Sequence, residues 1–132
     1  MEIKVSQEQV RVPVTILKVS GDIDSSTYES FEKTAKDAIE GGARYILLDL
    51  TKVAFVSSAG LRAIHEIYKV LSAKSPEVSE AEIHKGINAG TYKSPHLKLS
   101  NLNEGVDRVL KMAGFDMYLS SYDNQSKALD SF

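Results

Sequence analysis

The 132-residue chain contains no cysteine, which excludes disulfides, thiolate catalysis and zinc or iron–sulfur sites built on cysteine. It also lacks an excess of positive charge, because sixteen Lys and Arg residues stand against eighteen Asp and Glu residues. A phosphate backbone selects a clear basic excess in the proteins that bind it. The composition therefore excludes a protein that binds nucleic acid through bulk charge.

Long apolar runs are missing as well. No segment approaches the roughly eighteen consecutive apolar residues that a membrane span requires. The charged N-terminal segment MEIKVSQEQV lacks the apolar region of a secretory signal. We therefore expect a cytoplasmic protein that does not bind membranes. With 42% hydrophobic and 26% charged residues, the chain has the composition of a globular domain.

The first half of the chain changes from strand to helix patterns and back. Apolar residues two positions apart over residues 3–19 predict two strands, joined by a turn at residues 7–9. A helix then begins at Ser26, where the spacing to Glu29 is that of a capping box. The apolar run at residues 45–48 shows no alternation, which predicts a strand covered on both faces, as in a parallel sheet.

The second half continues this alternation. Its predicted elements are, in order, a helix that begins at Ser57 or Ser58, a strand at 96–102, a helix at 106–113, a strand at 117–119 and a terminal helix capped by Asp123. The order β-β-α-β-α-β-α-β-α predicts an α/β fold with a mostly parallel central sheet, opened by a β-hairpin, and with helices packed on it. We expect one domain over residues 1–132, with residues 72–95 as an exposed excursion between the second helix and the fourth strand.

The candidate functional site lies where the third strand ends and the second helix begins. Asp49-Leu50-Thr51 closes the strand, and the segment SSAGL at residues 57–61 opens the helix. Ligands and partners of an open α/β sheet engage at the carboxyl ends of its strands. A helix N-terminus there suits a phosphate, bound or covalent, through its free amides and its dipole. The structural alternative is that Ser57 or Ser58 only caps the helix.

Patterns for catalysis and metal binding are weak. Ser58 lacks the first glycine of a nucleophile elbow because residue 56 is valine, which leaves a serine hydrolase as a distant alternative. His65, His84 and His96 do not have the spacing of metal ligands, and there is no glycine-rich phosphate loop. We therefore expect a non-enzymatic protein with no cofactor and no metal.

Three segments closely resemble the STAS domain family and, within it, the anti-sigma factor antagonists. They are SGDIDSSTYESF (20–31), ILLDLTKVAFVSSAGLRAI (46–64) and LKLSNLNEGVDRVLKMAGFDMYLSSYDNQSKAL (97–129). Together they carry four separated motifs in the family's order, and the resemblance covers about residues 1–71 and 96–132. It implies the same α/β fold and a protein that acts by binding another protein.

The resemblance also implies roles for individual residues. In such proteins the serine two positions before a glycine is phosphorylated by a partner that is both anti-sigma factor and serine kinase. Gly60 matches that glycine and Ser58 matches the acceptor, while Ser57, the alternative acceptor, stands where the family often has aspartate. Asp24 matches an acidic residue that lines the partner-binding surface. We expect this surface to comprise Asp22, Asp24, Thr51, Ser57, Ser58, Ala59, Gly60 and Leu61.

The implied function is an anti-sigma factor antagonist that phosphorylation switches, with an anti-sigma factor that has serine-kinase activity as its partner. By binding this partner it would regulate sigma-factor-dependent transcription, and a serine phosphatase is a candidate second partner. Two other functions fit the same pattern. One is a receiver domain with Asp49 as phospho-acceptor beside Asp22 and Asp24, and the other is a STAS subunit of a transporter or of a stress-sensing complex.

Overall fold

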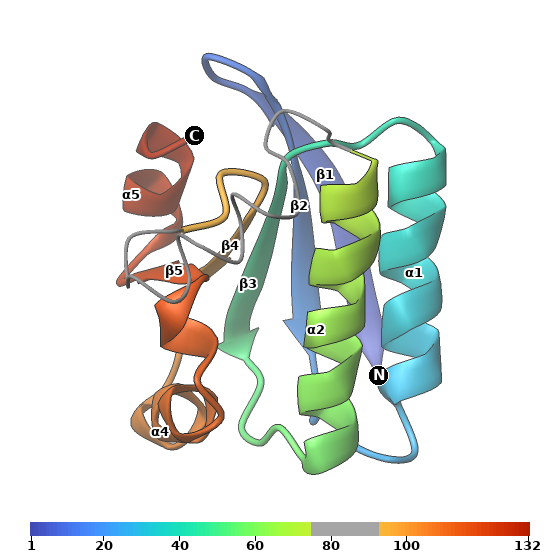
Figure 1. Cartoon of the computed structure of the whole chain (residues 1–132), viewed down its shortest axis with the longest axis vertical. Coiled ribbons are helices and arrows are strands. Elements are labelled where there is room, and N and C mark those ends of the chain that lie inside the picture. Colours follow the sequence, from blue (N-terminus) through green and yellow to red (C-terminus); the bar gives the residue numbers. More distant parts are fainter. Residues whose placement is uncertain (75–92) are drawn as a thin grey trace.

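The computed structural model describes residues 1–74 and 93–132. In these residues five strands form one sheet in the order β1-β2-β3-β4-β5 (Figure 1). β1 and β2 form an antiparallel hairpin, and the three later strands follow in parallel. The strands are β1 (Glu2–Gln9), β2 (Pro13–Ser20), β3 (Ile46–Lys52), β4 (Leu97–Ser100) and β5 (Ser120–Tyr122). The mostly parallel α/β sheet opened by a hairpin is confirmed.

Helices cover both faces of this sheet. α1 (Tyr28–Glu40) and α2 (Ser58–Ala73) lie side by side on one face, and α4 (Glu104–Met112) contributes to the same large core (Figure 1). The short α5 (Gln125–Asp130) packs against β3, β4 and β5 over a second, smaller core. No helix in the described ranges is long and apolar enough to cross a membrane.

The central strand β3 carries apolar side chains on both faces of the sheet, so both faces must be covered by helices. Successive side chains of a strand point to opposite faces. Leu48 belongs to the large core under α1 and α2, whereas its neighbour Leu47 belongs to the smaller core under α5. Both side chains are fully buried, as the apolar run without alternation predicts.

The start of α1 differs from the predicted capping box. The helix begins at Tyr28, its N-cap is Thr27, and no side chain caps it. The Thr27 hydroxyl instead donates to the backbone oxygen of Asp22 at 2.7 Å and accepts from the amide of Asp24 at 3.0 Å. The capping-box prediction was wrong because Ser26 lies before the N-cap, and its hydroxyl donates to Oδ1 of Asp24 at 2.6 Å within the preceding loop.

The hairpin turn lies later than predicted. β1 continues through Gln9, and the turn is formed by Val10, Arg11 and Val12. Val10 and Val12 of this turn are half-buried against the smaller core under α5.

The C-terminal boundaries also shift. Residues 117–119 are not a strand, because Gly114 ends α4 with a φ of 82° and Phe115–Met117 forms a 3₁₀ helix (η1). This turn directs Phe115, Tyr118 and Leu119 into the large core, and the strand begins only at Ser120. The fourth strand is shorter than predicted, and Asn124, not Asp123, caps the terminal helix.

Most of the predicted excursion at residues 72–95 lies outside the described residues. Its described ends belong to the folded domain. Ser72 and Ala73 are the last residues of α2, and Ser94 is buried, with its amide donating to the backbone oxygen of Tyr118 at 2.8 Å. The second helix therefore extends two residues into the predicted excursion, whereas the fourth strand begins at Leu97, one residue later than predicted.

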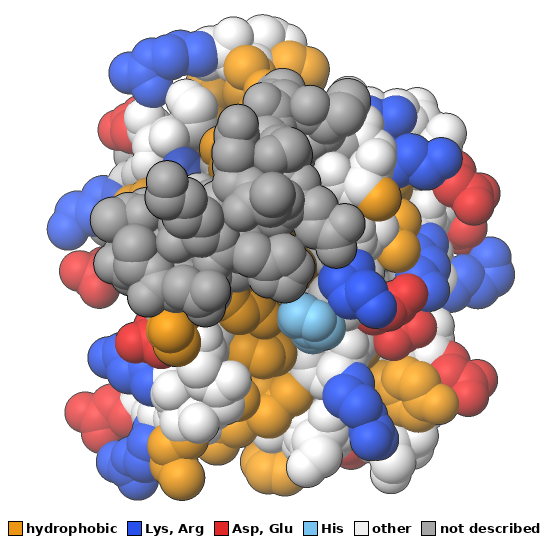
Figure 2. Space-filling view, viewed as in Figure 1, with side chains coloured by type: hydrophobic (Ala, Val, Ile, Leu, Met, Phe, Trp, Pro, Cys, Tyr) orange, Lys and Arg blue, Asp and Glu red, His pale blue; other side chains and the backbone are white. Residues whose placement is uncertain are grey.

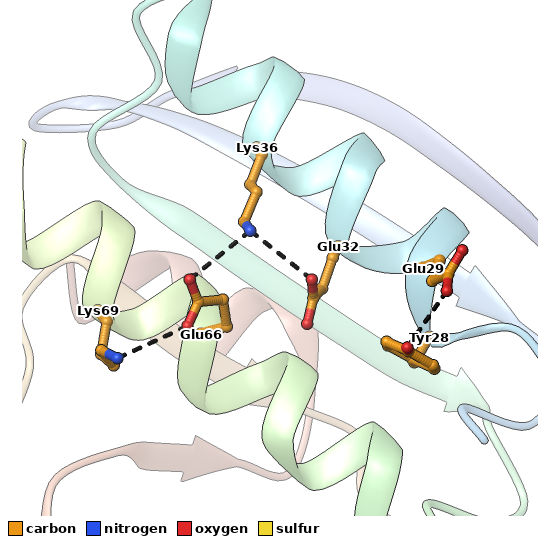
Figure 3. A network of polar contacts seen from close by, with 6 residues as sticks. All are labelled: Tyr28, Glu29, Glu32, Lys36, Glu66 and Lys69. Carbon is orange, nitrogen blue, oxygen red and sulfur yellow. Dashed lines mark hydrogen bonds and ion pairs between the residues drawn. The ribbon is translucent and has the colours of Figure 1, made fainter. Parts of the chain in front are cut away.

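A network of charged side chains joins α1 to α2 across the surface (Figure 3). The ammonium of Lys36 lies 3.7 Å from Glu32 on its own helix and 3.6 Å from Glu66 on α2. Glu66 also lies 3.7 Å from Lys69. Because exposed pairs of this length contribute about 0–1 kcal/mol, the packing of the two helices rests on their apolar faces.

Candidate functional site

An isolated β-bridge joins the two loops that the sequence singled out. Ile23, in the loop after β2, pairs with Val56, in the loop after β3. The amide of Ile23 donates to the Phe55 oxygen at 3.0 Å, and the amide of Ser57 donates to the Ile23 oxygen at 2.9 Å. The loop that carries Asp22 and Asp24 is thereby held against the start of α2.

Gly60 allows the first turn of α2 to approach this bridge. A Cβ at position 60 would lie 2.3 Å from the backbone oxygen of Ile23 and 2.8 Å from Cγ1 of Val56. No real Cβ tolerates such a contact with backbone, so only glycine fits without a shift of one loop. Gly60 and Ala59, both predicted for the partner-binding surface, are buried at the start of α2.

Replacing Gly60 with alanine is expected to lower the free energy of unfolding by about 1–3 kcal/mol, because the added methyl group overpacks the bridge. The measurement is urea denaturation. The matched control is Gly105→Ala in α4, where a Cβ would meet its nearest neighbour at 3.4 Å and alanine favours the helix. Equal stabilities of the two variants would contradict the close approach at Gly60.

The two serines at the start of α2 have different positions. Ser57 is the N-cap, and its hydroxyl accepts from the amide of Gly60 at 3.3 Å. Ser58 is the first helical residue and is exposed, and its hydroxyl has no hydrogen-bond partner within residues 1–74 and 93–132. A phosphate on Ser58 would therefore reach solvent beside the positive end of the helix dipole without breaking the cap.

Asp24 organises the neighbouring loop. Its Oδ1 atom accepts from the amide of Ser26 at 2.9 Å and from the Ser26 hydroxyl at 2.6 Å. Because these hydrogen bonds favour the charged form, they hold the pKa of Asp24 below its ordinary value. Asp22 is exposed, so the loop presents two carboxylates next to the bridge.

Thr51 lies apart from the residues at the start of α2. Its amide and hydroxyl donate to Oδ1 of Asp49 at 3.0 and 2.6 Å, and Asn101 donates to the same oxygen at 3.2 Å. Leu50 is buried under the helices, so Thr51 points to the opposite face of the sheet. There Asp49 and Thr51 line a hollow of about 270 Å³ together with Lys18.

This environment bears on the receiver interpretation. Asp49 is buried, and one of its carboxylate oxygens accepts three hydrogen bonds. These hydrogen bonds hold Oδ1 within the fold, which does not favour Asp49 as a phosphoryl acceptor, although its side chain also lines the hollow beside Lys18.

Two residues of the site were missed in the sequence. Asn103 caps α4 and donates its side-chain amide to the backbone oxygens of Val53 and Ala54 at 3.1 and 3.3 Å, which anchors the loop before α2. Phe55, in the same loop, is 51% exposed. Figure 2 shows hydrophobic side chains at the surface of the lower end of the molecule, which is the end where α2 begins in Figure 1. The sequence did contain a signal for Asn103, because an asparagine three positions before Val106, the first apolar residue of the predicted helix at 106–113, is typical of a helix cap.

The described histidines have structural partners. Nδ1 of His65 lies 2.9 Å from the Tyr118 hydroxyl, and Nδ1 of His96 lies 2.7 Å from the Arg44 oxygen. Burial lowers the pKa of His65 and raises the pKa of Tyr118 to about 12. Among the described residues no three His, Asp or Glu side chains could hold a metal ion, and His84 lies outside these residues.

Comparison with known proteins extends this picture. The chain matches the family model for the STAS domain over residues 5–84. It is 26% identical over 130 residues to an anti-sigma F factor antagonist of Paenibacillus polymyxa, covering 98% of this chain and 94% of that relative.

Solved structures share the fold. A candidate anti-sigma factor antagonist of Thermotoga maritima superposes with a TM-score of 0.71 at 24% identity, over 96% of this chain and 92% of that one. The anti-sigma factor antagonist SpoIIAA in its unphosphorylated form superposes with a TM-score of 0.67 at 17% identity, over 96% and 94% of the two chains. Because the family model covers more than half of its residues, this chain belongs to the STAS domain family, as its motifs indicate.

Proposed function

We propose that this protein is an anti-sigma factor antagonist, and that phosphorylation of Ser58 switches it off. In the unphosphorylated state the surface formed by the Asp22–Asp24 loop and the start of α2 binds an anti-sigma factor, which frees a sigma factor for transcription. The name of the Paenibacillus relative supports the class of partner. The partner is also the serine kinase, and a serine phosphatase restores the binding form.

The observation that carries this proposal is the position of the Ser58 hydroxyl. It is exposed at the first helical residue of α2, whereas the neighbouring Ser57 hydroxyl is engaged as the cap. A kinase therefore finds one accessible hydroxyl at the helix start, next to the loop that carries the two carboxylates. The adjacent exposed Phe55 supplies the apolar contact area that protein interfaces favour.

The proposed switch acts on the surface and not on the fold. A phosphoserine adds about 1.5 to 2 negative charges and three acceptor oxygens. The N-terminus of α2 stabilises such a charge, so the domain stays folded. The same charge is added to a surface that already carries Asp22 and Asp24, which changes its complementarity to the partner.

Mapping the phosphate tests the proposal. The protein is captured from its native cells with its partner, incubated with ATP, and analysed by intact-mass and fragmentation mass spectrometry. We expect one phosphate, on Ser58. Ser57→Ala is the matched control and stays phosphorylatable, whereas Ser58→Ala does not accept phosphate.

Other outcomes separate the alternatives. Phosphate on Ser57 alone would shift the acceptor by one residue. Capture of a transporter or of a large stress-sensing complex, with no phosphate on either serine, would contradict the proposed function and favour another role within the family.

A further inference from the structure

β1 is a long, regular and exposed edge strand. Among the described strands it pairs with β2 alone, through eight consecutive residues from Glu2 to Gln9 without a bulge (Figure 1). Every residue of β1 except Ile3 is exposed, and the strand contains neither proline nor glycine. Natural sheets usually protect such an edge, because its unpaired backbone groups are a template for another strand.

The charges on β1 are arranged in an unusual way. Lys4, Ser6 and Glu8 alternate and therefore lie on one face of the sheet. Lys4 stands directly opposite Lys18 of β2, a juxtaposition of like charges that destabilises a sheet. Within the described ranges neither Lys4 nor Glu8 forms an ion pair. Both charges are available to a partner.

We propose that β1 pairs antiparallel with β1 of a second copy of this chain, about a two-fold axis at Ser6. In this register Lys4 stands opposite the partner's Glu8, and Glu8 stands opposite the partner's Lys4. Two symmetric ion pairs form, and each gives Lys4 a carboxylate partner, which it does not have among residues 1–74 and 93–132. Such a self-complementary interface is what a two-fold dimer requires.

The charge pattern selects this register over its neighbours. Antiparallel registers change in steps of two residues, because a slip of one turns every side chain to the other face. One step in one direction places Glu2 opposite the partner's Glu8, and two steps place Lys4 opposite the partner's Lys4. One step in the other direction forms no ion pair and shortens the pairing. Only the register centred on Ser6 combines opposite charges with nearly the whole strand.

The other face of β1 adds an apolar contribution. Val5 is 53% exposed, and in the proposed register it lies diagonal to the partner's Val5 across the two-fold axis. No residue of the candidate partner-binding surface lies on β1, so the proposed dimer is independent of the function proposed for Ser58.

Charge reversal tests the pairing, with sedimentation equilibrium of the full chain as the measurement. Lys4→Glu and Glu8→Lys each create like-charged pairs, so each variant alone is expected to dimerise at least tenfold more weakly than the parent protein. Mixed together, the two variants are complementary and form a heterodimer, and Lys4→Glu combined with Glu8→Lys in one chain restores the homodimer. Glu40→Lys, at the exposed end of α1, is the matched control and leaves dimerisation unchanged.

A crosslink reports the register itself. Because the chain has no cysteine, Ser6→Cys introduces a single thiol at the two-fold axis, and mild oxidation is expected to yield a disulfide-linked dimer. Ser30→Cys on exposed α1 is the control and stays monomeric on gels. A parent protein that is monomeric at millimolar concentration, or a dimer that the charge reversals leave unchanged, would overturn the proposal.

Discussion

Replacing Leu48 with alanine is expected to lower the free energy of unfolding by about 2–5 kcal/mol, the range for a buried leucine truncated in a core. Leu48 is 0% exposed and sits on β3, the middle strand of five. Its register partners are Leu17 on β2 and Leu99 on β4, and both are buried in the same core. Because strands lie on both sides of Leu48, the surrounding core can collapse only partly into the cavity that the substitution leaves.

The measurement is urea denaturation followed by circular dichroism, with the slope checked for two-state behaviour. Met112→Ala is the control, because Met112 is of similar size but 82% exposed, so its loss is expected to change stability by no more than about 0.5 kcal/mol. A loss below about 1 kcal/mol for Leu48→Ala would contradict the central, doubly covered position of β3.

The element order could be predicted because each element carries its own periodicity. Phe31, Ala35 and Ile39 recur every four residues and form the buried face of α1, and the unbroken run around Leu48 marks a strand covered on both faces. These patterns depend only on which side of an element meets the core. They are therefore visible without the tertiary structure.

The boundaries could not be predicted in the same way, because they depend on contacts between distant segments. Thr27 has the residue type of a cap, yet its hydroxyl bonds the loop at Asp22 and Asp24. Tyr118 and Leu119 resemble a strand locally, yet the 3₁₀ turn after Gly114 carries them into the core. In both cases tertiary packing overrides a local pattern.

The candidate site, like the fold, could be predicted only in part from the sequence. The sequence located it through the serines at the start of α2, but two adjacent serines look equivalent until the hydrogen bond from Gly60 identifies Ser57 as the cap. The close approach of Gly60 to Ile23 joins residues 37 positions apart, which no local pattern encodes. Thr51 was included as a neighbour in sequence, although strand alternation turns it to the other face.

Substitution of Ser58 by glutamate is expected to weaken binding to the anti-sigma factor at least tenfold, which corresponds to about 1.4 kcal/mol. The carboxylate places a permanent charge where the phosphate would stand, next to the carboxylates of Asp22 and Asp24, though without the full charge of a phosphate. The fold should tolerate it, because a negative charge at the start of α2 interacts favourably with the helix dipole. The weakening should therefore appear in the dissociation constant, measured by calorimetry with the purified partner, and not in the free energy of unfolding.

Three controls separate charge from structure in this experiment. Ser58→Ala should bind like the parent protein and change stability by no more than about 0.5 kcal/mol, because the Ser58 hydroxyl caps nothing. Ser57→Ala removes the cap and should cost about 0.5–2 kcal/mol of stability without the loss of affinity that an added charge causes. Ala73→Glu adds the same charge at the exposed opposite end of α2 and should leave affinity unchanged. Equal affinities for Ser58→Glu and Ala73→Glu would show that charge at the start of α2 does not control binding, and the protein would then be a constitutive binding module.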